Sequence, residues 1–135
     1  MNFISIGKGM LAGFVVLSVL QFLSFLGLPW LLNSGSVPAP TLLVLLVGAR
    51  LVILLLAGMT TGYVTMRCDA TRSLLNAALA GALLQFLMAL WAIESMQRIS
   101  ALAVAIVYIG VSAGLGVAGA YLHVYQSRRV AGGVK

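Results

Sequence analysis

The chain has 135 residues, of which 62% are hydrophobic and 7% are charged, and its mean hydropathy is +1.15. A soluble domain carries about 25% charged residues, so this composition excludes that class and is typical of an integral membrane protein in a lipid bilayer. The formal net charge is +6, but the basic residues are dispersed and form no patch, which excludes a nucleic-acid partner. A single cysteine, Cys68, excludes a disulfide within the chain.

Four apolar segments predict four membrane-spanning helices, at residues 6–32, 41–66, 74–93 and 99–125. At about 1.5 Å per residue, each is long enough to cross a hydrocarbon core of about 30 Å. The connection between the last two segments is so short that these helices must be antiparallel neighbours. We therefore expect an all-α, integral membrane four-helix bundle that forms a single transmembrane domain over residues 1–135.

The basic residues outside the spans lie almost entirely on one side of the predicted bundle. By the positive-inside rule, this distribution places both termini in the cytoplasm. Only Arg98 falls on the opposite side, against Lys8, Arg67, Arg72, Arg128, Arg129 and Lys135.

Arg50 lies in the middle of the otherwise uncharged run of 26 residues at 41–66. An arginine near mid-bilayer costs about 2.5 to 3.5 kcal/mol on insertion scales, so it usually faces a partner or a cavity. Counted from the outer helix ends, Gln21, Gln85 and Tyr108 fall at a similar depth, and their oxygens could accept from the five guanidinium donors. Three interpretations stay open: a polar cluster that bridges helices, an arginine that extends to the outer surface, or a site for a ligand or partner.

Small residues spaced four apart predict close helix packing, because they place backbones near one another on one helix face. Packing inside one bundle and oligomerisation both account for the pattern. The predicted packing residues are Gly58, Gly62, Gly110, Gly114, Gly116 and Ala120.

The two halves of the chain are weakly alike. The tripeptide LAG at 11–13 recurs at 79–81, and QFL at 21–23 recurs at 85–87, although offsets of 68 and 64 require a gap. The similarity indicates either a parallel duplication of a helical hairpin or chance likeness between Leu- and Ala-rich helices.

Catalytic chemistry has few candidate residues. Neither of the two acidic residues lies within a span, and a lone histidine, His123, cannot supply a multi-histidine metal site or bis-histidine haem ligation. We predict that the chain is not an enzyme and has no catalytic residues, metal site or cofactor.

The stretch AGMTTGYVTMRCDATRSLLNAALAGAL at 57–83, together with GLGVAGAYL at 114–122, resembles a pattern found in small four-span bacterial membrane proteins of uncharacterised function. The resemblance implies a bacterial inner-membrane location but transfers no functional residue. The expected function is an accessory or assembly subunit that acts by helix packing, with a membrane-protein partner or a homo-oligomer. The alternatives are an oligomeric transport or channel protein that uses Arg50 for an anion, and a holin-like lesion former.

Overall fold

The computed structural model describes residues 2–33, 38–69, 71, 73–93 and 99–132, and these form four helices: α1 (Phe3–Asn33), α2 (Ala39–Cys68), α3 (Leu74–Ile93) and α4 (Ile99–Gly132). The all-α prediction is confirmed. Helix α3 begins and ends as predicted, whereas α1 begins three residues earlier and α4 ends seven residues later than expected.

Local hydrogen bonds explain these helix boundaries. The side-chain oxygen of Asn2 accepts from the backbone N–H of Ser5 at 3.3 Å, so Asn2 caps α1 before its apolar run begins. Pro38 precedes α2, and its carbonyl accepts from the N–H of Leu42 at 3.0 Å. At the end of α4 the apolar pattern stops, but good helix formers such as Gln and Arg continue the helix.

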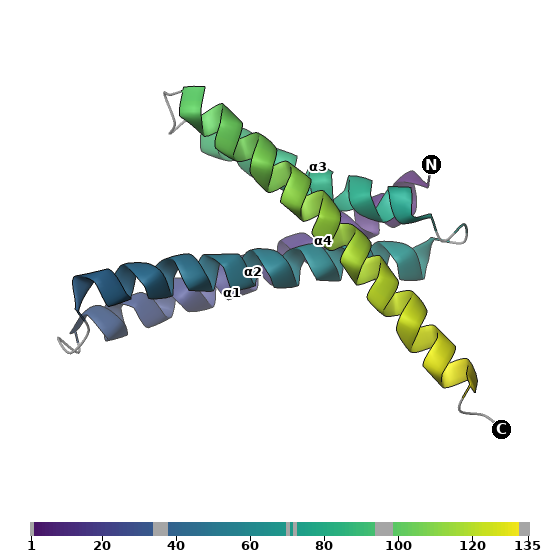
Figure 1. Cartoon of the computed structure of the whole chain (residues 1–135), viewed down its shortest axis with the longest axis horizontal. Coiled ribbons are helices and arrows are strands. Elements are labelled where there is room, and N and C mark those ends of the chain that lie inside the picture. The colour runs from purple at the N-terminus through teal and green to yellow at the C-terminus, as the bar shows by residue number, and fades with distance from the viewer. Residues whose placement is uncertain (1, 34–37, 70, 72, 94–98, 133–135) are drawn as a thin grey trace.

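The helices form two antiparallel hairpins, α1–α2 and α3–α4, that cross one another (Figure 1). Helix α2 packs against all three other helices, α3 also contacts α1, and α1 and α4 do not touch in the described part of the chain. Beyond the crossing, the hairpins diverge toward the connections after α1 and after α3 (Figure 1). Both ends of the chain lie on the other side of the crossing.

The molecular surface is apolar along most of its length. Within the described residues, three helices contain stretches long and apolar enough to span a membrane, Phe3–Gly27, Pro40–Cys68 and Ala105–Arg129, and α3 carries a shorter apolar stretch, Leu74–Ala89. Large hydrophobic side chains cover the outside, while many of the fully buried residues are small or polar. Such a surface fits a lipid environment rather than water.

Candidate functional site

The two hairpins meet where α2 crosses α4, and glycines allow this close contact. A Cβ added to Gly62 would overlap the backbone of Gly116, and one added to Gly119 would overlap the carbonyl of Met59. A Cβ on Gly58 would approach the side chain of Leu115 to 2.8 Å. The missing side chains therefore let the two backbones touch directly, which is how helices gain packing energy in lipid. We call this contact the crossing.

Each hairpin also has a seam of small residues along its own helix pair. In the first, Gly9 and Gly13 of α1 lie against Thr65 and Thr61 of α2, and both threonines are fully buried. Their hydroxyls donate to the carbonyls four residues earlier, at 2.7 and 2.8 Å, so neither is left without a partner.

The second hairpin repeats this arrangement. Gly81 lies against Ser112, whose hydroxyl donates to the Gly81 carbonyl at 2.9 Å, and Gly116 lies against Ala77. The α1 positions 9 and 13 correspond to 77 and 81 in α3, an offset of 68 that matches the LAG repeat. The facing positions 61 and 65 of α2 correspond to 112 and 116 of α4, an offset of 51, so a gap is still needed, and duplication and chance similarity both stay open.

The structure separates the predicted packing residues into two groups. Gly58, Gly62 and Gly116 lie in helix contacts, and Ala120 is fully buried. The other two, Gly110 and Gly114, are exposed, and a Cβ at either would meet no atom of the described residues within 4 Å, so packing through them in an oligomer stays a prediction. Their face of α4 turns away from α2 and α3, although the spacing is the same as at the crossing.

Arg50 lies beyond the crossing, on the side of α2 that packs against Gly13 of α1. It is 7 and 11 residues before Ala57 and Thr61, which share its side of the helix and are at most 1% exposed. Arg50 itself is exposed, about 12 Å along the helix from Gly58. Along this face, the side chains change from buried at Ala57 to exposed at Arg50.

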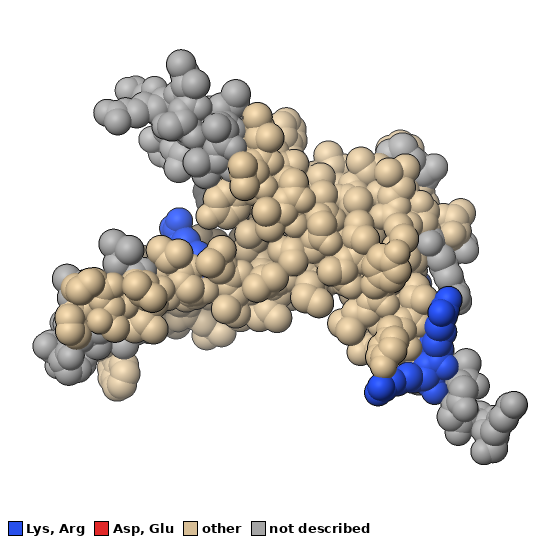
Figure 2. Space-filling model, in the orientation of Figure 1, with Lys and Arg blue, Asp and Glu red and all other residues tan. Residues whose placement is uncertain are grey.

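Tyr108 occupies the corresponding place on α4. It is four residues before Ser112 and seven before Leu115, both of which face other helices, yet its own side chain is 39% exposed. We call the region where the two hairpins diverge, which includes Arg50 on α2 and Tyr108 on α4, the wedge. The space-filling view shows it as an open angle between two arms (Figure 2).

In the described part of the chain, no direct hydrogen bonds connect Arg50 to the other residues of the predicted polar cluster. None of the hydrogen bonds between described side chains joins Arg50 to Gln21, Gln85 or Tyr108. Gln85 is half-buried beside Gly81, in the contact of α3 with α4, whereas Gln21 is exposed on α1. Arg50 and Gln21 belong to the first hairpin, and Gln85 and Tyr108 belong to the second; a contact between them through one water stays a prediction.

At the end of the molecule opposite the wedge, the buried carboxylate of Asp69 accepts hydrogen bonds from several neighbouring groups. Asp69, 3% exposed, follows α2, and its oxygens accept from Asn76 Nδ2 at 2.7 Å and from the hydroxyl of Thr71 at 2.8 Å. Backbone N–H groups of Thr71 and Ser73 donate at 3.1 and 3.2 Å, and Asn2 adds a long bond of 3.5 Å. Burial raises the pKa of Asp69, but these hydrogen bonds outweigh it and hold the pKa well below its usual range.

The Asp69 network ties the start of α1 and the start of α3 to the end of α2. Sequence reasoning missed it, although Asp, Thr, Ser and Asn just before or at the start of an apolar helix are a capping signal. The Asp69 carboxylate makes these hydrogen bonds to other parts of the fold, so we assign the network a structural role.

His123 lies between α4 and α2 at the same end. Its ring meets Tyr63 edge-on, with centroids 5.0 Å apart, and its buried Nδ1 has no hydrogen-bond partner among the described residues. The Tyr63 hydroxyl donates to Gln126 Oε1 at 3.1 Å. These contacts brace α4 against α2. In the described residues, no group of three His, Cys, Asp or Glu side chains could hold a metal ion.

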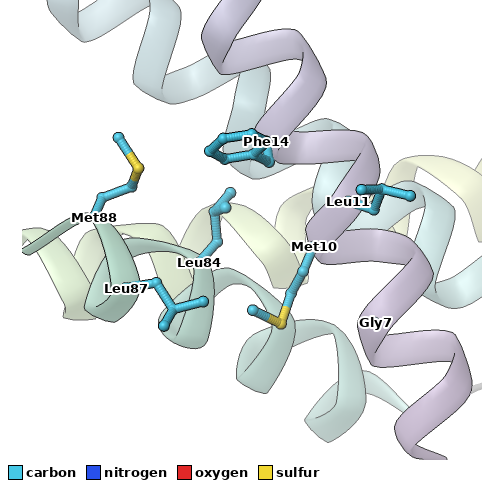
Figure 3. A pocket seen from close by; sticks show the side chains of 7 residues that line it. All are labelled: Gly7, Met10, Leu11, Phe14, Leu84, Leu87 and Met88. Atoms are coloured by element: carbon cyan, nitrogen blue, oxygen red, sulfur yellow. The ribbon is translucent and has the colours of Figure 1, made fainter. Parts of the chain in front are cut away.

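An apolar pocket of about 370 Å³ opens between α1 and α3 (Figure 3). Its lining has no charged side chain, so it offers nothing that would orient a polar ligand. The lining residues are Gly7, Met10, Leu11, Phe14, Leu84, Leu87 and Met88.

Comparisons with protein-family models, with curated proteins and with solved structures find no match for the chain. The assignment of function therefore rests on the crossing, on the wedge and on the basic residues that lie on the side of the two termini.

Proposed function

We propose that this protein is a four-span integral protein of a bacterial inner membrane, with both termini in the cytoplasm, and that it acts as an accessory or assembly subunit. Three apolar helices and the shorter apolar α3 support the four spans. The basic residues concentrated on the side of the termini support the orientation. In this role, the wedge receives a transmembrane helix of the partner.

The exposure of Arg50 within the span Pro40–Cys68 is the observation that carries this proposal. Lipid cannot hydrogen-bond a guanidinium, so a mid-span arginine is stable only where acceptors or water reach it. This chain supplies no acidic residue for that purpose within the described helices. A carboxylate or a group of polar oxygens on a partner helix would match the guanidinium geometry and offset its insertion cost.

The crossing supplies the rigidity that such a site needs. Close contact between backbones at Gly62 and Gly116 leaves little room for the hairpins to slide past one another. This contact therefore fixes the position of each hairpin along the other, so the wedge is present before a partner helix binds.

Photo-crosslinking from two matched tyrosine positions of α4 tests the proposal. A photoreactive phenylalanine analogue replaces Tyr108, in the wedge, or Tyr121, which is 59% exposed on the outward face. We expect a discrete protein adduct from position 108 and none from position 121, and we expect it to disappear in Arg50→Leu. Sequencing of the adduct should identify a membrane-spanning segment with an acidic or polar residue. An adduct that forms equally from both positions would refute the proposal.

A second candidate, an anion path lined by Arg50 in a homo-oligomer, is favoured by the same exposed guanidinium. It predicts that the adduct from position 108 is a second copy of this chain. It also predicts chloride efflux from proteoliposomes that is lost in Arg50→Leu and partly kept in Arg50→Lys, where the charge remains. Adducts with a different protein and no efflux would exclude this candidate.

A further inference from the structure

The outward face of α4 changes in character along the helix. Small residues without neighbours come first, two exposed tyrosines follow, and two exposed arginines end the series. Spacings of four, seven and eight residues keep the tyrosines and arginines on one side, opposite the side that carries Ser112 and Gly116. We call this the outward face; its residues are Gly110, Gly114, Tyr121, Tyr125, Arg128 and Arg129.

The basic end of this face has no acidic counterpart. Within the described residues the only acidic side chain is Asp69, which is buried and already accepts five hydrogen bonds. The guanidinium of Arg129 lies 4.8 Å from the centre of the Tyr125 ring, which holds it beside the aromatic side chain. Figure 2 shows the basic side chains gathered near the C-terminal end of α4.

The opposite side of α4 fixes the direction in which this face points. Gln126 accepts from Tyr63 of α2, and His123 packs edge-on against the same ring. The hydroxyl of Ser127 donates to the carbonyls of His123 and Val124, at 3.0 and 2.9 Å, within the helix. Because α2 holds the inner side, the tyrosines and arginines must turn outward.

The order of side chains along the outward face of α4 matches the order of layers in one leaflet of a membrane, from hydrocarbon through the interface to the headgroups. From Gly114 to Arg128 the helix rises about 21 Å, enough to cover about 15 Å of hydrocarbon and the headgroup region beyond it. Tyrosines concentrate at the interface between these regions, and arginines bind phosphate through two parallel hydrogen bonds. At Gly110 and Gly114 no side chain covers the helix backbone at hydrocarbon depth, and we call this part of the outward face the notch.

We propose that the outward face of α4 binds an anionic phospholipid of the cytoplasmic leaflet. Arg128 and Arg129 hold the headgroup phosphate, Tyr125 lies at the interface, and an acyl chain runs along the notch at Gly110 and Gly114. This proposal rests on the proposed span and orientation, with both termini in the cytoplasm, and it does not depend on a partner in the wedge. An apolar and aromatic face above the arginines favours a lipid over a soluble phosphate compound.

Lipid retention on the purified protein tests the proposal. The protein in neutral detergent is titrated with phosphatidylglycerol, with phosphatidylcholine and with inorganic phosphate, and bound lipid is counted by native mass spectrometry. Each basic residue near an anionic surface contributes about fivefold in affinity, so we expect Arg128→Gln/Arg129→Gln to weaken phosphatidylglycerol binding about thirtyfold. Phosphatidylcholine binding should change little.

A matched control removes two positive charges elsewhere at the same end of the molecule. Lys8→Gln/Arg67→Gln lowers the net charge equally, but on α1 and α2. We expect this control to retain the preference for phosphatidylglycerol, and both double variants to keep the parent's helix content by circular dichroism.

Two further variants test the notch and the arginine geometry. Gly114→Leu fills the notch without changing charge and should weaken lipid binding, whereas Arg129→Lys should keep part of it. Equal losses in the two double variants, or an unchanged preference in Arg128→Gln/Arg129→Gln, would overturn the proposal. Binding of inorganic phosphate with the same dependence on the arginines, and no preference for lipid, would assign a free-anion site instead.

Discussion

Substituting Gly62 by alanine should separate the two hairpins. The added Cβ would lie 2.5 Å from the carbonyl carbon and 2.7 Å from the Cα of Gly116, and closer still to its carbonyl oxygen. Ordinary contact between such atoms needs about 3.5 to 4.0 Å, so α2 and α4 must move apart by about 1 Å. All of these neighbouring atoms belong to the backbone, so no side chain can rotate away. Overpacking of this kind costs about 1 to 3 kcal/mol.

The matched control is Gly110→Ala, on the same protein but outside any contact. Its Cβ would meet no atom of the described residues within 4 Å, and alanine favours a helix over glycine by up to about 1 kcal/mol. Unfolding in mixed detergent micelles, followed by circular dichroism, should therefore show Gly62→Ala as less stable than the parent and Gly110→Ala as equal or more stable. Equal stability of the two variants would mean that the crossing is not the contact that holds the hairpins together.

Three other predictions concern single residues and topology. Arg50→Leu should insert and fold at least as well as the parent, because it removes a cost of about 2.5 to 3.5 kcal/mol, yet it should no longer co-purify with a partner; a variant that fails to fold would mean that the charge is needed by the bundle itself. Asp69 has a lowered pKa in the folded state, so its stabilisation is present above the unfolded value of about 4 and is lost as pH falls toward the folded value. Asp69→Asn should therefore be less stable at pH 7, and its unfolding midpoint should change less than the parent's between pH 5 and pH 3; parallel curves would contradict this assignment. Reporter fusions after Ser36 and after Lys135 should report an external and a cytoplasmic location, respectively, and an external reporter after Lys135 would reverse the proposed orientation.

The four helices could be predicted because the length of an apolar run is a property of the sequence alone. The antiparallel pairing of α3 and α4 likewise follows from the short connection between them. The packing residues were predicted only in part. Gly58 and Gly62 share their spacing with Gly110 and Gly114, and only the angle at which the hairpins cross decides which pair meets another helix.

The candidate functional site was also predicted only in part from the sequence. Arg50 was recognised because a charge in an apolar span is costly wherever the helix lies. The lack of a direct hydrogen bond from Arg50 to Gln85 or Tyr108 could not be predicted, because matched depth says nothing about the divergence of the two hairpins. Asp69 carried a readable capping signal, but the bond from Asn2, 67 residues away, depends on the packing of three helices.

The crossing is the pivot about which the two hairpins would rotate relative to one another. Along the helices, Arg50 lies about 12 Å from Gly58 on one side of the crossing, and Gln126 lies about 10 Å from Gly119 on the other side. When rigid rods share a pivot, the angle on one side cannot change without the same change on the other. Any rotation that widens or narrows the wedge must therefore strain or release the bond between Tyr63 and Gln126 at the opposite end.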